Sequence, residues 1–353
     1  MPNNHQATAA AIRSAYGHRL KAADYRELVS LHSVQEVVSY LKETEGYGDL
    51  LRGLEPSYTH RGYLEMLLKR NLFTQCLHFC SLEHLQNTPF FRFFIYDYEI
   101  RELIKKLLLM PEGVQAYISA MDAWLDPYFS FPMDRLARAD SAAELIAAAA
   151  GTPYQAVLKK QLSPETGRPY DFTACEIALR ACYLERILKE AESTVRGSDL
   201  EALRDLIGEQ IDLINLINAY RLKRVFHAEE DTLRSMMLPI PGRLPRRTCD
   251  ALYAAPNLDA FLEVLKTTRY GRLLNGVTGL SDPSDSIRLE HAFQTLRCRS
   301  ARNALHFSSH AAVSLYAVHF LYQTEVQNLI TIIEGIRYGK PASYMQELLV
   351  LET

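Results

Sequence analysis

One helical pattern occurs three times in this chain, and its regular spacing constrains the fold more than any other feature. Each copy begins with an acidic residue, at Glu99, Asp212 and Glu325, and the two intervals (212 − 99 and 325 − 212) are equal at 113. Apolar residues follow each acid at one, four, five and eight positions, which places them on one stripe of an α-helix. Equal intervals of a shared pattern predict a triplicated helical repeat. The apolar residues are Ile100, Leu103, Ile104 and Leu107, then Leu213, Leu216, Ile217 and Tyr220, then Val326, Leu329, Ile330 and Ile333.

The second and third copies share two residues beyond the stripe, an asparagine three positions after the acid and an arginine twelve positions after it. The first copy has Glu102 and Pro111 at the same places, and a proline inside a helix removes a backbone donor and interrupts it. The three repeats are therefore not expected to contact partners in the same way. The shared residues are Asn215 and Asn328, and Arg224 and Arg337.

Each repeat is expected to open with two short helices and a turn that contains glycine and tyrosine. Ser33 is a candidate N-cap of the second short helix, and Glu36 would complete a capping box. Segment 41–51 has a near copy at 265–274, and a weaker copy lies at 134–154. The openings of the repeats therefore support the same triplication as the long helices.

Two long helices are expected to follow each opening, and strand patterns are nearly absent. Proline-rich linkers at 126–132 and 238–245 separate the repeats. We therefore predict an all-α chain of three similar helical units, 1–126, 127–238 and 239–353. The expected long helices are 62–85 and 90–109, 174–195 and 200–226, and 286–305 and 312–338.

The composition narrows the classes of partner. Of the 353 residues 48% are apolar and 23% are charged, and the net charge is −3. A net charge this small produces only a weak electrostatic field, so neither nucleic acid nor an anionic membrane is the obvious partner. Two basic clusters, 221–224 and 243–247, are too short for a nucleic-acid groove, and cations at a helix C-terminus also offset the helix dipole. We therefore expect no nucleic-acid partner.

Six cysteines are scattered without the paired spacing of a disulfide framework, and no signal peptide precedes them, which favours a reducing cytoplasm. The run 303–324 carries no Lys, Arg, Asp or Glu and is long enough to span a bilayer. It contains histidines and serines, which are costly in hydrocarbon, and 307–309 is typical of a turn. We expect a buried helix of a soluble core in this region.

Motifs for catalysis and for metal binding are missing from the sequence. It has no Gly-rich phosphate loop, no GxSxG elbow, no HExxH and no CxxC. Cys76, Cys80 and His84 recur every four residues and would share one helix face, but a fourth metal ligand is not evident. His306 and His310 have the same spacing, with no carboxylate between them. We expect no catalytic residue, no cofactor, no bound metal and no small-molecule substrate.

The three repeated acids could be catalytic carboxylates or part of a membrane ion site, because carboxylates occur in both kinds of site. One acid per repeat, near the polar edge of an amphipathic helix, instead favours repeated contacts between helices. The acids are therefore expected to be structural.

The order of these elements resembles a known family. Residues 325–330 (Glu-Val-Gln-Asn-Leu-Ile) and 335–342 (Gly-Ile-Arg-Tyr-Gly-Lys-Pro-Ala) end the last repeat, and 40–44 (Tyr-Leu-Lys-Glu-Thr) is followed by Tyr47-Gly48 in the first. Together they resemble the central-stalk subunit of V/A-type rotary ATPases, which is called C in prokaryotes and d in eukaryotes. The likeness covers 11–349, and its order of elements is specific although no single motif is diagnostic.

The resemblance implies an all-helical funnel of three similar units around a pseudo-threefold axis. Such a protein caps the cytoplasmic side of the membrane proteolipid ring as a peripheral component and receives the end of the central shaft. It performs no chemistry but transmits torque for ATP-coupled transport of protons or sodium ions. A helical-repeat scaffold, with RNA among its potential partners, is the alternative.

The basic residues at two helix ends are the candidate partner contacts. Three of them follow the second copy of the pattern and two follow the third, so the triplication would place them at one level. Their other possible role is to stabilise helix ends, which contributes about 0.3–1 kcal/mol each. The residues are Arg221, Lys223, Arg224, Arg337 and Lys340.

Overall fold

The part of the chain that the structure describes is mainly helical. In this computed structural model its regular elements are α-helices and short 3-10 helices, with no strand among the described residues. The all-α prediction is confirmed. The described residues are 5–110, 123–162, 170–274 and 284–351.

Two compact units divide the chain, and each is assembled from segments that are far apart in the sequence. The long helix α11 (Gly197–Phe226) contributes its first residues to the first unit and the remainder to the second. The first unit is 1–91, 195–206 and 272–353, and the second is 92–194 and 207–271.

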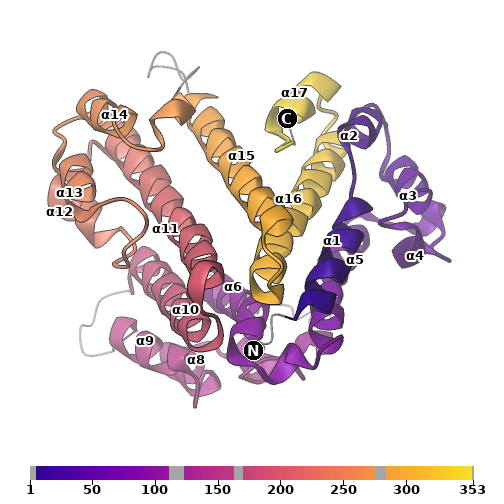
Figure 1. The fold of residues 1–353 in the computed structure, drawn as a ribbon, viewed down its shortest axis with the longest axis horizontal. Helices are drawn as coiled ribbons and strands as arrows, with labels where there is room; N and C mark the ends of the chain where they lie inside the picture. Colours follow the sequence, from indigo (N-terminus) through magenta and orange to yellow (C-terminus); the bar gives the residue numbers. More distant parts are fainter. Residues whose placement is uncertain (1–4, 111–122, 163–169, 275–283, 352–353) are drawn as a thin grey trace. The chain divides into compact units, whose positions relative to one another are not determined.

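The first unit joins the beginning of the chain to its end. Helices α15 and α16 form a hairpin, and α1 and α5 pack beside α16 (Figure 1). The N-terminal segment therefore packs against the last long helix. The α-helices are α1 (Gln6–Gly17), α2 (Ala22–Leu28), α3 (Val34–Lys42), α4 (Gly48–Leu51), α5 (Arg61–Ser81), α15 (Ser284–Phe307), α16 (Ala311–Arg337) and α17 (Ala342–Leu348).

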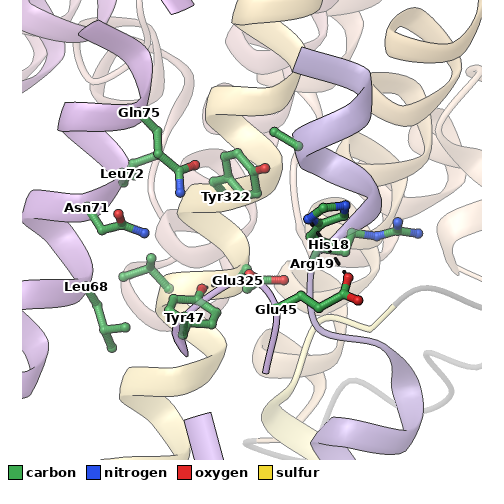
Figure 2. A pocket seen from close by; sticks show the side chains of 13 residues that line it. His18, Arg19, Glu45, Tyr47, Leu68, Asn71, Leu72, Gln75, Tyr322 and Glu325 are labelled. Atoms are coloured by element: carbon green, nitrogen blue, oxygen red, sulfur yellow. Dashed lines mark hydrogen bonds and ion pairs between the residues drawn. The ribbon is translucent and has the colours of Figure 1, made fainter. Parts of the chain in front are cut away.

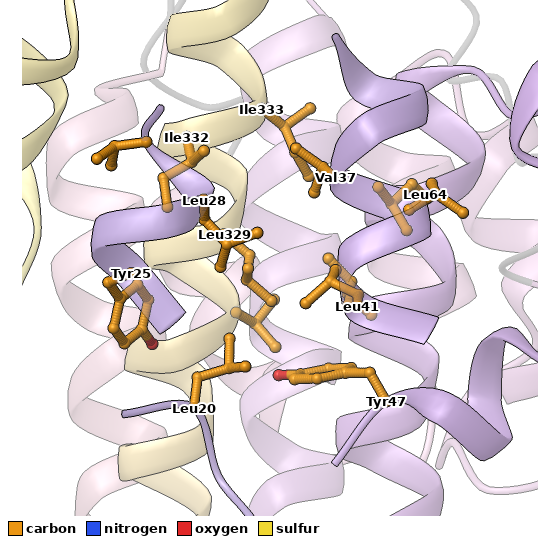
Figure 3. Close-up of a cluster of buried hydrophobic side chains, with 14 of the residues drawn as sticks. Leu20, Tyr25, Leu28, Val37, Leu41, Tyr47, Leu64, Leu329, Ile332 and Ile333 are labelled. Atoms are coloured by element: carbon orange, nitrogen blue, oxygen red, sulfur yellow. The ribbon is translucent and has the colours of Figure 1, made fainter. Parts of the chain in front are cut away.

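The core of the first unit lies between the two short N-terminal helices and α16. Leu28 of α2, Leu41 of α3 and Leu64 of α5 converge on α16 (Figure 3). Leu329 and Ile333 of α16 meet them and are fully buried. Each such side chain contributes about 1.5–3 kcal/mol by leaving water. This apolar contact holds the N-terminal helices on α16, the last long helix.

The second unit contains the rest of the predicted first repeat, most of the second and the opening of the third. Helix α10 packs on α6 and on α9, so α6 is covered by a helix of the following repeat. The α-helices besides α11 are α6 (Phe93–Leu109), α7 (Met133–Arg138), α8 (Ala142–Ala148), α9 (Pro153–Gln161), α10 (Phe172–Thr194), α12 (Glu230–Ser235), α13 (Arg246–Ala254) and α14 (Leu258–Lys266).

The second short helix of each predicted repeat begins with the same kind of N-cap hydrogen bond. A side-chain oxygen at the N-cap accepts a hydrogen bond from the N–H three residues later, which satisfies one free donor of the first turn. Ser33 is such a cap, as predicted, but the Glu36 carboxylate accepts from the His32 N–H, one residue earlier than a capping box requires. The bonds are Glu36 N to Ser33 Oγ (3.2 Å), Glu144 N to Ser141 Oγ (3.3 Å) and Ala260 N to Asn257 Oδ1 (2.9 Å).

The apolar run 303–324 is a helical hairpin with a break. Helix α15 ends at Phe307, and His310 is the N-cap of α16, where its Nδ1 accepts the Ala312 N–H at 3.1 Å. The first half of α16 is almost completely buried. The prediction of a turn and a buried helix is confirmed. Within the described residues, no helix combines the length and the apolar character needed to span a bilayer.

Candidate functional site

The three repeated acids are buried, although the sequence pattern predicted a place near the polar edge of their helices. Glu99, Asp212 and Glu325 expose 0%, 3% and 8% of their surface. The expected edge position is wrong, because each carboxylate turns inward to accept hydrogen bonds. Since a buried charge is costly unless it is hydrogen-bonded, the partners of each acid explain its place.

The Glu99 acid–tyrosine cluster lies in the second unit and joins α6 to the opening of the second repeat. The Tyr154 hydroxyl donates to Glu99 Oε2 at 2.7 Å. Ser130 donates to Oε1 from its N–H at 2.5 Å and from its hydroxyl at 2.6 Å. Burial and the neighbouring carboxylate both raise the pKa of Tyr154, so this hydroxyl remains a donor.

The Asp212 acid–tyrosine cluster has the same chemistry on α11. The Tyr270 hydroxyl donates to Asp212 Oδ2 at 2.8 Å, and the N–H groups of Arg243 and Leu244 donate to the same oxygen at 2.9 and 3.0 Å. Burial raises the pKa of Asp212, while these hydrogen bonds oppose the shift. A Cβ on Gly242 would lie 2.0 Å from Asp212 Oδ1, so the linker approaches the carboxylate closely because this residue is glycine.

The Glu325 acid–tyrosine cluster lies in the first unit and completes the set (Figure 2). The Tyr47 hydroxyl donates to Glu325 Oε1 at 2.7 Å, and the Leu20 N–H donates to Oε2 at 3.0 Å. Burial and the Glu325 carboxylate raise the pKa of Tyr47 well above its ordinary value. The three clusters therefore share a carboxylate, a tyrosine hydroxyl and a backbone N–H.

The asparagines shared by the second and third copies also bind backbone. Asn215 accepts the Leu238 N–H at 2.8 Å and donates to the Leu238 carbonyl at 3.4 Å. Asn328 makes the same pair of bonds with Val350, at 3.0 and 2.9 Å. The first copy departs from this, as its sequence suggested, because the Glu102 carboxylate lies 3.4 Å from Lys105 Nζ.

The basic residues predicted as partner contacts fall into two groups, one in each unit. In the second unit Arg221 is exposed and Arg224 is half-buried, with its Nη1 3.3 Å from the Tyr220 hydroxyl. Lys223 is buried, and its ammonium donates to the Ala255 carbonyl at the end of α13. Burial lowers the pKa of Lys223. Within this chain, Lys223 therefore caps the first short helix of the next repeat.

The group in the first unit is an exposed patch at the end of α16. Arg337 lies 5.4 Å from the Tyr338 ring centre, and Lys340 Nζ lies 5.5 Å from that of Tyr344. Both tyrosines are exposed, Tyr338 by 62%. Cations beside exposed aromatic rings are common at protein interfaces, so this patch is suited to a partner contact.

The proposed cysteine and histidine faces do not form as the spacing indicated. Cys76 and Cys80 are buried in α5, but His84 lies beyond the end of that helix. Burial raises the pKa of Cys80 to about 12, so its thiol stays protonated. These cysteines are core residues.

The partners of the acids were missed by the sequence reasoning. The sequence pattern places Tyr47, Tyr154 and Tyr270 in the turn of each repeat opening but does not identify them as hydrogen-bond donors. A signal was present, because the positions of Tyr47 and Tyr270 differ by 223 (270 − 47), and those of Leu20 and Arg243 differ by the same amount (243 − 20). The two donors of each acid thus recur together at one spacing.

Comparison with known proteins identifies the family of the chain. The family model described as ATP synthase (C/AC39) subunit matches residues 8–348. The chain belongs to the ATP synthase (C/AC39) subunit family. The match includes all three acid–tyrosine clusters and all five basic residues.

Three relatives in this family are each named as the C subunit of an A-type ATP synthase. The protein of Methanosphaera stadtmanae is 21% identical over 97% of this chain and 86% of its own length. That of Desulfurococcus sp. is 25% identical over 76% of this chain and 69% of its own. The protein of Methanosarcina mazei is 24% identical over 96% of this chain and 91% of its own length. For the Methanosphaera and Methanosarcina proteins the likeness covers nearly all of this chain, and for the Desulfurococcus protein about three quarters of it.

Proposed function

We propose that this chain is a non-catalytic rotor subunit of an A-type ATP synthase, where it links the central shaft to the membrane proteolipid ring and transmits torque. The family match over residues 8–348 carries this proposal. The complex would couple ATP synthesis or hydrolysis to transport of protons or sodium ions. The chain would sit on the cytoplasmic face of the membrane as a peripheral subunit.

The internal contacts support a torque-bearing role. A part that transmits torque must resist deformation, and close-packed helices have low compressibility. Each acid–tyrosine cluster adds charge-assisted hydrogen bonds between a long helix and the opening of another repeat, at about 1.5–3 kcal/mol per bond. We propose that these contacts join three similar units, 1–126, 127–238 and 239–353.

The partner contact is proposed for the basic residues that face outward. Arg221 and Arg224 would contact a partner in the second unit, and Arg337 and Lys340 in the first. Lys223 belongs to the predicted set, but its ammonium donates to Ala255 within the chain, so we propose that it supports the contact from inside the unit. A like-sign charge placed across such an interface costs several kcal/mol.

Co-purification tests membership of the complex. The chain carrying an affinity tag is expressed from its own locus, and membranes are solubilised in mild detergent. We expect the nucleotide-binding subunits and the proteolipid to co-purify in fixed ratio. Recovery of the folded chain without either of them would overturn the proposal.

Charge reversal tests the contact surface. The double variant Arg224→Glu, Arg337→Glu is expected to keep its circular dichroism spectrum and to lose most of the co-purified proteolipid. The matched control Arg52→Glu, Arg138→Glu reverses one exposed arginine in each unit, and we expect it to co-purify normally. Equal co-purification in both double variants would remove these residues from the interface.

A further inference from the structure

The corner between α15 and α16, residues 308–310, joins several distant segments of the first unit. The Arg13 guanidinium of α1 donates to the Ser308 carbonyl at 2.7 Å. The Ser308 hydroxyl donates at 2.7 Å to Asp199 Oδ1, in the first turn of α11, and accepts the His310 N–H at 3.1 Å. The corner therefore ties α1 and the beginning of α11 to the last helical hairpin.

His310 holds this corner through a hydrogen bond that only its unprotonated Nδ1 can accept. It is the N-cap of α16, and its Nδ1 accepts the Ala312 N–H at 3.1 Å. An imidazolium carries a hydrogen on both ring nitrogens, so protonation would replace this acceptor with a second donor. It would also place a positive charge at the N-terminus of a 27-residue helix, where the helix dipole disfavours cations. His310 exposes only 7% of its surface, so little solvent is present to offset either cost.

The titratable and charged neighbours of His310 come from α1, α11 and the residues after α5. Asp199 favours the protonated ring, whereas His5, the residue before α1, disfavours it. His5 lies 3.8 Å from the Glu83 carboxylate, and Arg13 adds a fixed positive charge to the corner. Burial is the largest effect, and it lowers the pKa of His310. The folded corner thus binds this proton less readily than a solvent-exposed histidine does.

The direction of the pH effect follows from that difference in proton affinity. Above the ordinary histidine pKa of about 6.5, the ring is neutral whether the corner is closed or open. As pH falls below that value, the open corner takes up the proton first, so acid favours opening. The stability that the neutral ring gives to the closed corner is therefore present at neutral pH and is lost on acidification.

We propose that residues 308–310 form an acid-sensitive latch, which is closed at neutral pH and releases α1 and the first turn of α11 as pH falls below about 6.5. Protonation of His310 ends its cap of α16, and the bonds from Ser308 to Asp199 and from Arg13 to Ser308 loosen with it. Because α11 continues from the first unit into the second, the latch sets how firmly the start of a helix shared by both units is held. The latch belongs to the isolated chain, so this proposal does not depend on the proposed function.

Hydrogen exchange of the purified chain, followed by mass spectrometry at about pH 5.5 and about pH 7.5, tests the latch. Rates are divided by the intrinsic exchange rate at each pH, so that only opening is compared. We expect protection of 197–206 and 308–316 to fall by up to about tenfold at the lower pH, the limit set by an open-state histidine pKa of about 6.5. Protection of α3, which does not contribute to the corner, should change by less than about twofold.

His310→Asn separates the cap from the titration, because an asparagine oxygen caps a helix but takes up no proton in this range. This variant should keep the neutral-pH protection and lose most of the pH dependence. His310→Ala removes the cap at every pH, so its protection should be low and independent of pH. The matched control His32→Asn removes an exposed histidine elsewhere in the first unit and should keep the full pH dependence.

Two results would overturn the proposal. One is protection of 197–206 and 308–316 that does not change with pH in the unaltered chain. The other is a pH dependence in His310→Asn as large as that of the unaltered chain.

Discussion

The Glu325 and Asp212 acid–tyrosine clusters use the same chemistry under different chain connectivity. Each carboxylate accepts one tyrosine hydroxyl, at 2.7 Å for Glu325 and 2.8 Å for Asp212, and at least one backbone N–H. Asp212 is 58 residues from its tyrosine, whereas Glu325 is 278 residues from Tyr47. Closing the longer loop costs only about 1.4 kcal/mol more, from (3/2)RT ln(278/58).

The comparison shows that the contact between repeats does not need a short linker. The donors to Asp212 follow α11 closely in the sequence. If these hydrogen bonds break, the short connection still keeps the donors near Asp212. Around Glu325 the segment 6–51 reaches α16 through side-chain and backbone contacts made across most of the length of the chain. The Glu325 acid–tyrosine cluster should therefore be the place where the molecule opens first.

The largest expected effect is that of Glu325→Ala. It leaves the Tyr47 hydroxyl and the Leu20 N–H without their acceptor, and an unpaired buried donor costs about 1–3 kcal/mol. We expect a loss of about 3–5 kcal/mol in the free energy of unfolding, with faster hydrogen exchange throughout 6–51. Asp212→Ala should lose a similar free energy while exchange rises only near 238–274.

Urea denaturation and hydrogen exchange followed by mass spectrometry measure both quantities. Gln327→Ala, on the exposed side of α16, serves as the control and should change the free energy of unfolding by less than about 0.5 kcal/mol. If hydrogen exchange rose over segments of similar length in Glu325→Ala and Asp212→Ala, the difference in chain connectivity would have no effect on local opening.

A smaller effect is expected from the asparagines. Asn328→Ala removes two hydrogen bonds to Val350, near the end of the described chain, and Asn215→Ala removes the same two to Leu238, in the middle of the chain. We expect each to cost about 1–3 kcal/mol. Limited proteolysis should cut the Asn328→Ala chain after α17 first, because the Asn328 amide binds both the N–H and the carbonyl of Val350 in the segment that follows this helix. Faster cleavage near Leu238 in Asn215→Ala than near Val350 in Asn328→Ala would contradict this.

The smallest effect is a pH dependence at Asp212. Burial raises its pKa in the folded chain, so as pH rises the unfolded state loses its proton first and the folded state becomes less favoured. The raised pKa thus favours folding below the ordinary aspartate range, and this advantage disappears as pH rises through the folded pKa. Asp212→Asn does not titrate there, so its stability relative to the unaltered chain should improve between pH 3 and pH 7. Urea midpoints measured across that range test the sign, and a relative loss would contradict it.

Much of the fold could be predicted because its signals are local. The apolar residues at one, four and eight positions after each acid are buried, and the six long helices begin and end within a few residues of their predicted bounds except near 81–93. There the break is longer than expected, since α5 ends at Ser81 and short 3-10 turns precede α6. Periodicity thus predicted the elements better than the irregular turns between them.

The partners of the acids could not be predicted from local patterns. Tyr47 and Glu325 meet across 278 residues, and no helical period carries that information. A hydropathy pattern predicts that carboxylates are exposed to solvent, so it places the acids near the polar edge of their helices. In the structure each acid accepts hydrogen bonds from two or three donors, which makes its burial favourable. Lys223 was grouped with exposed cations for the same reason, although its ammonium binds the Ala255 carbonyl inside the unit.

The most direct test of the proposed rotor function is coupling in membranes that lack this chain. Such membranes should hydrolyse ATP without pumping ions, and adding back the purified chain should restore pumping. The Arg224→Glu, Arg337→Glu variant should fold but fail to restore it, while the Arg52→Glu, Arg138→Glu control should succeed. Full ion pumping by membranes without the chain would contradict the account.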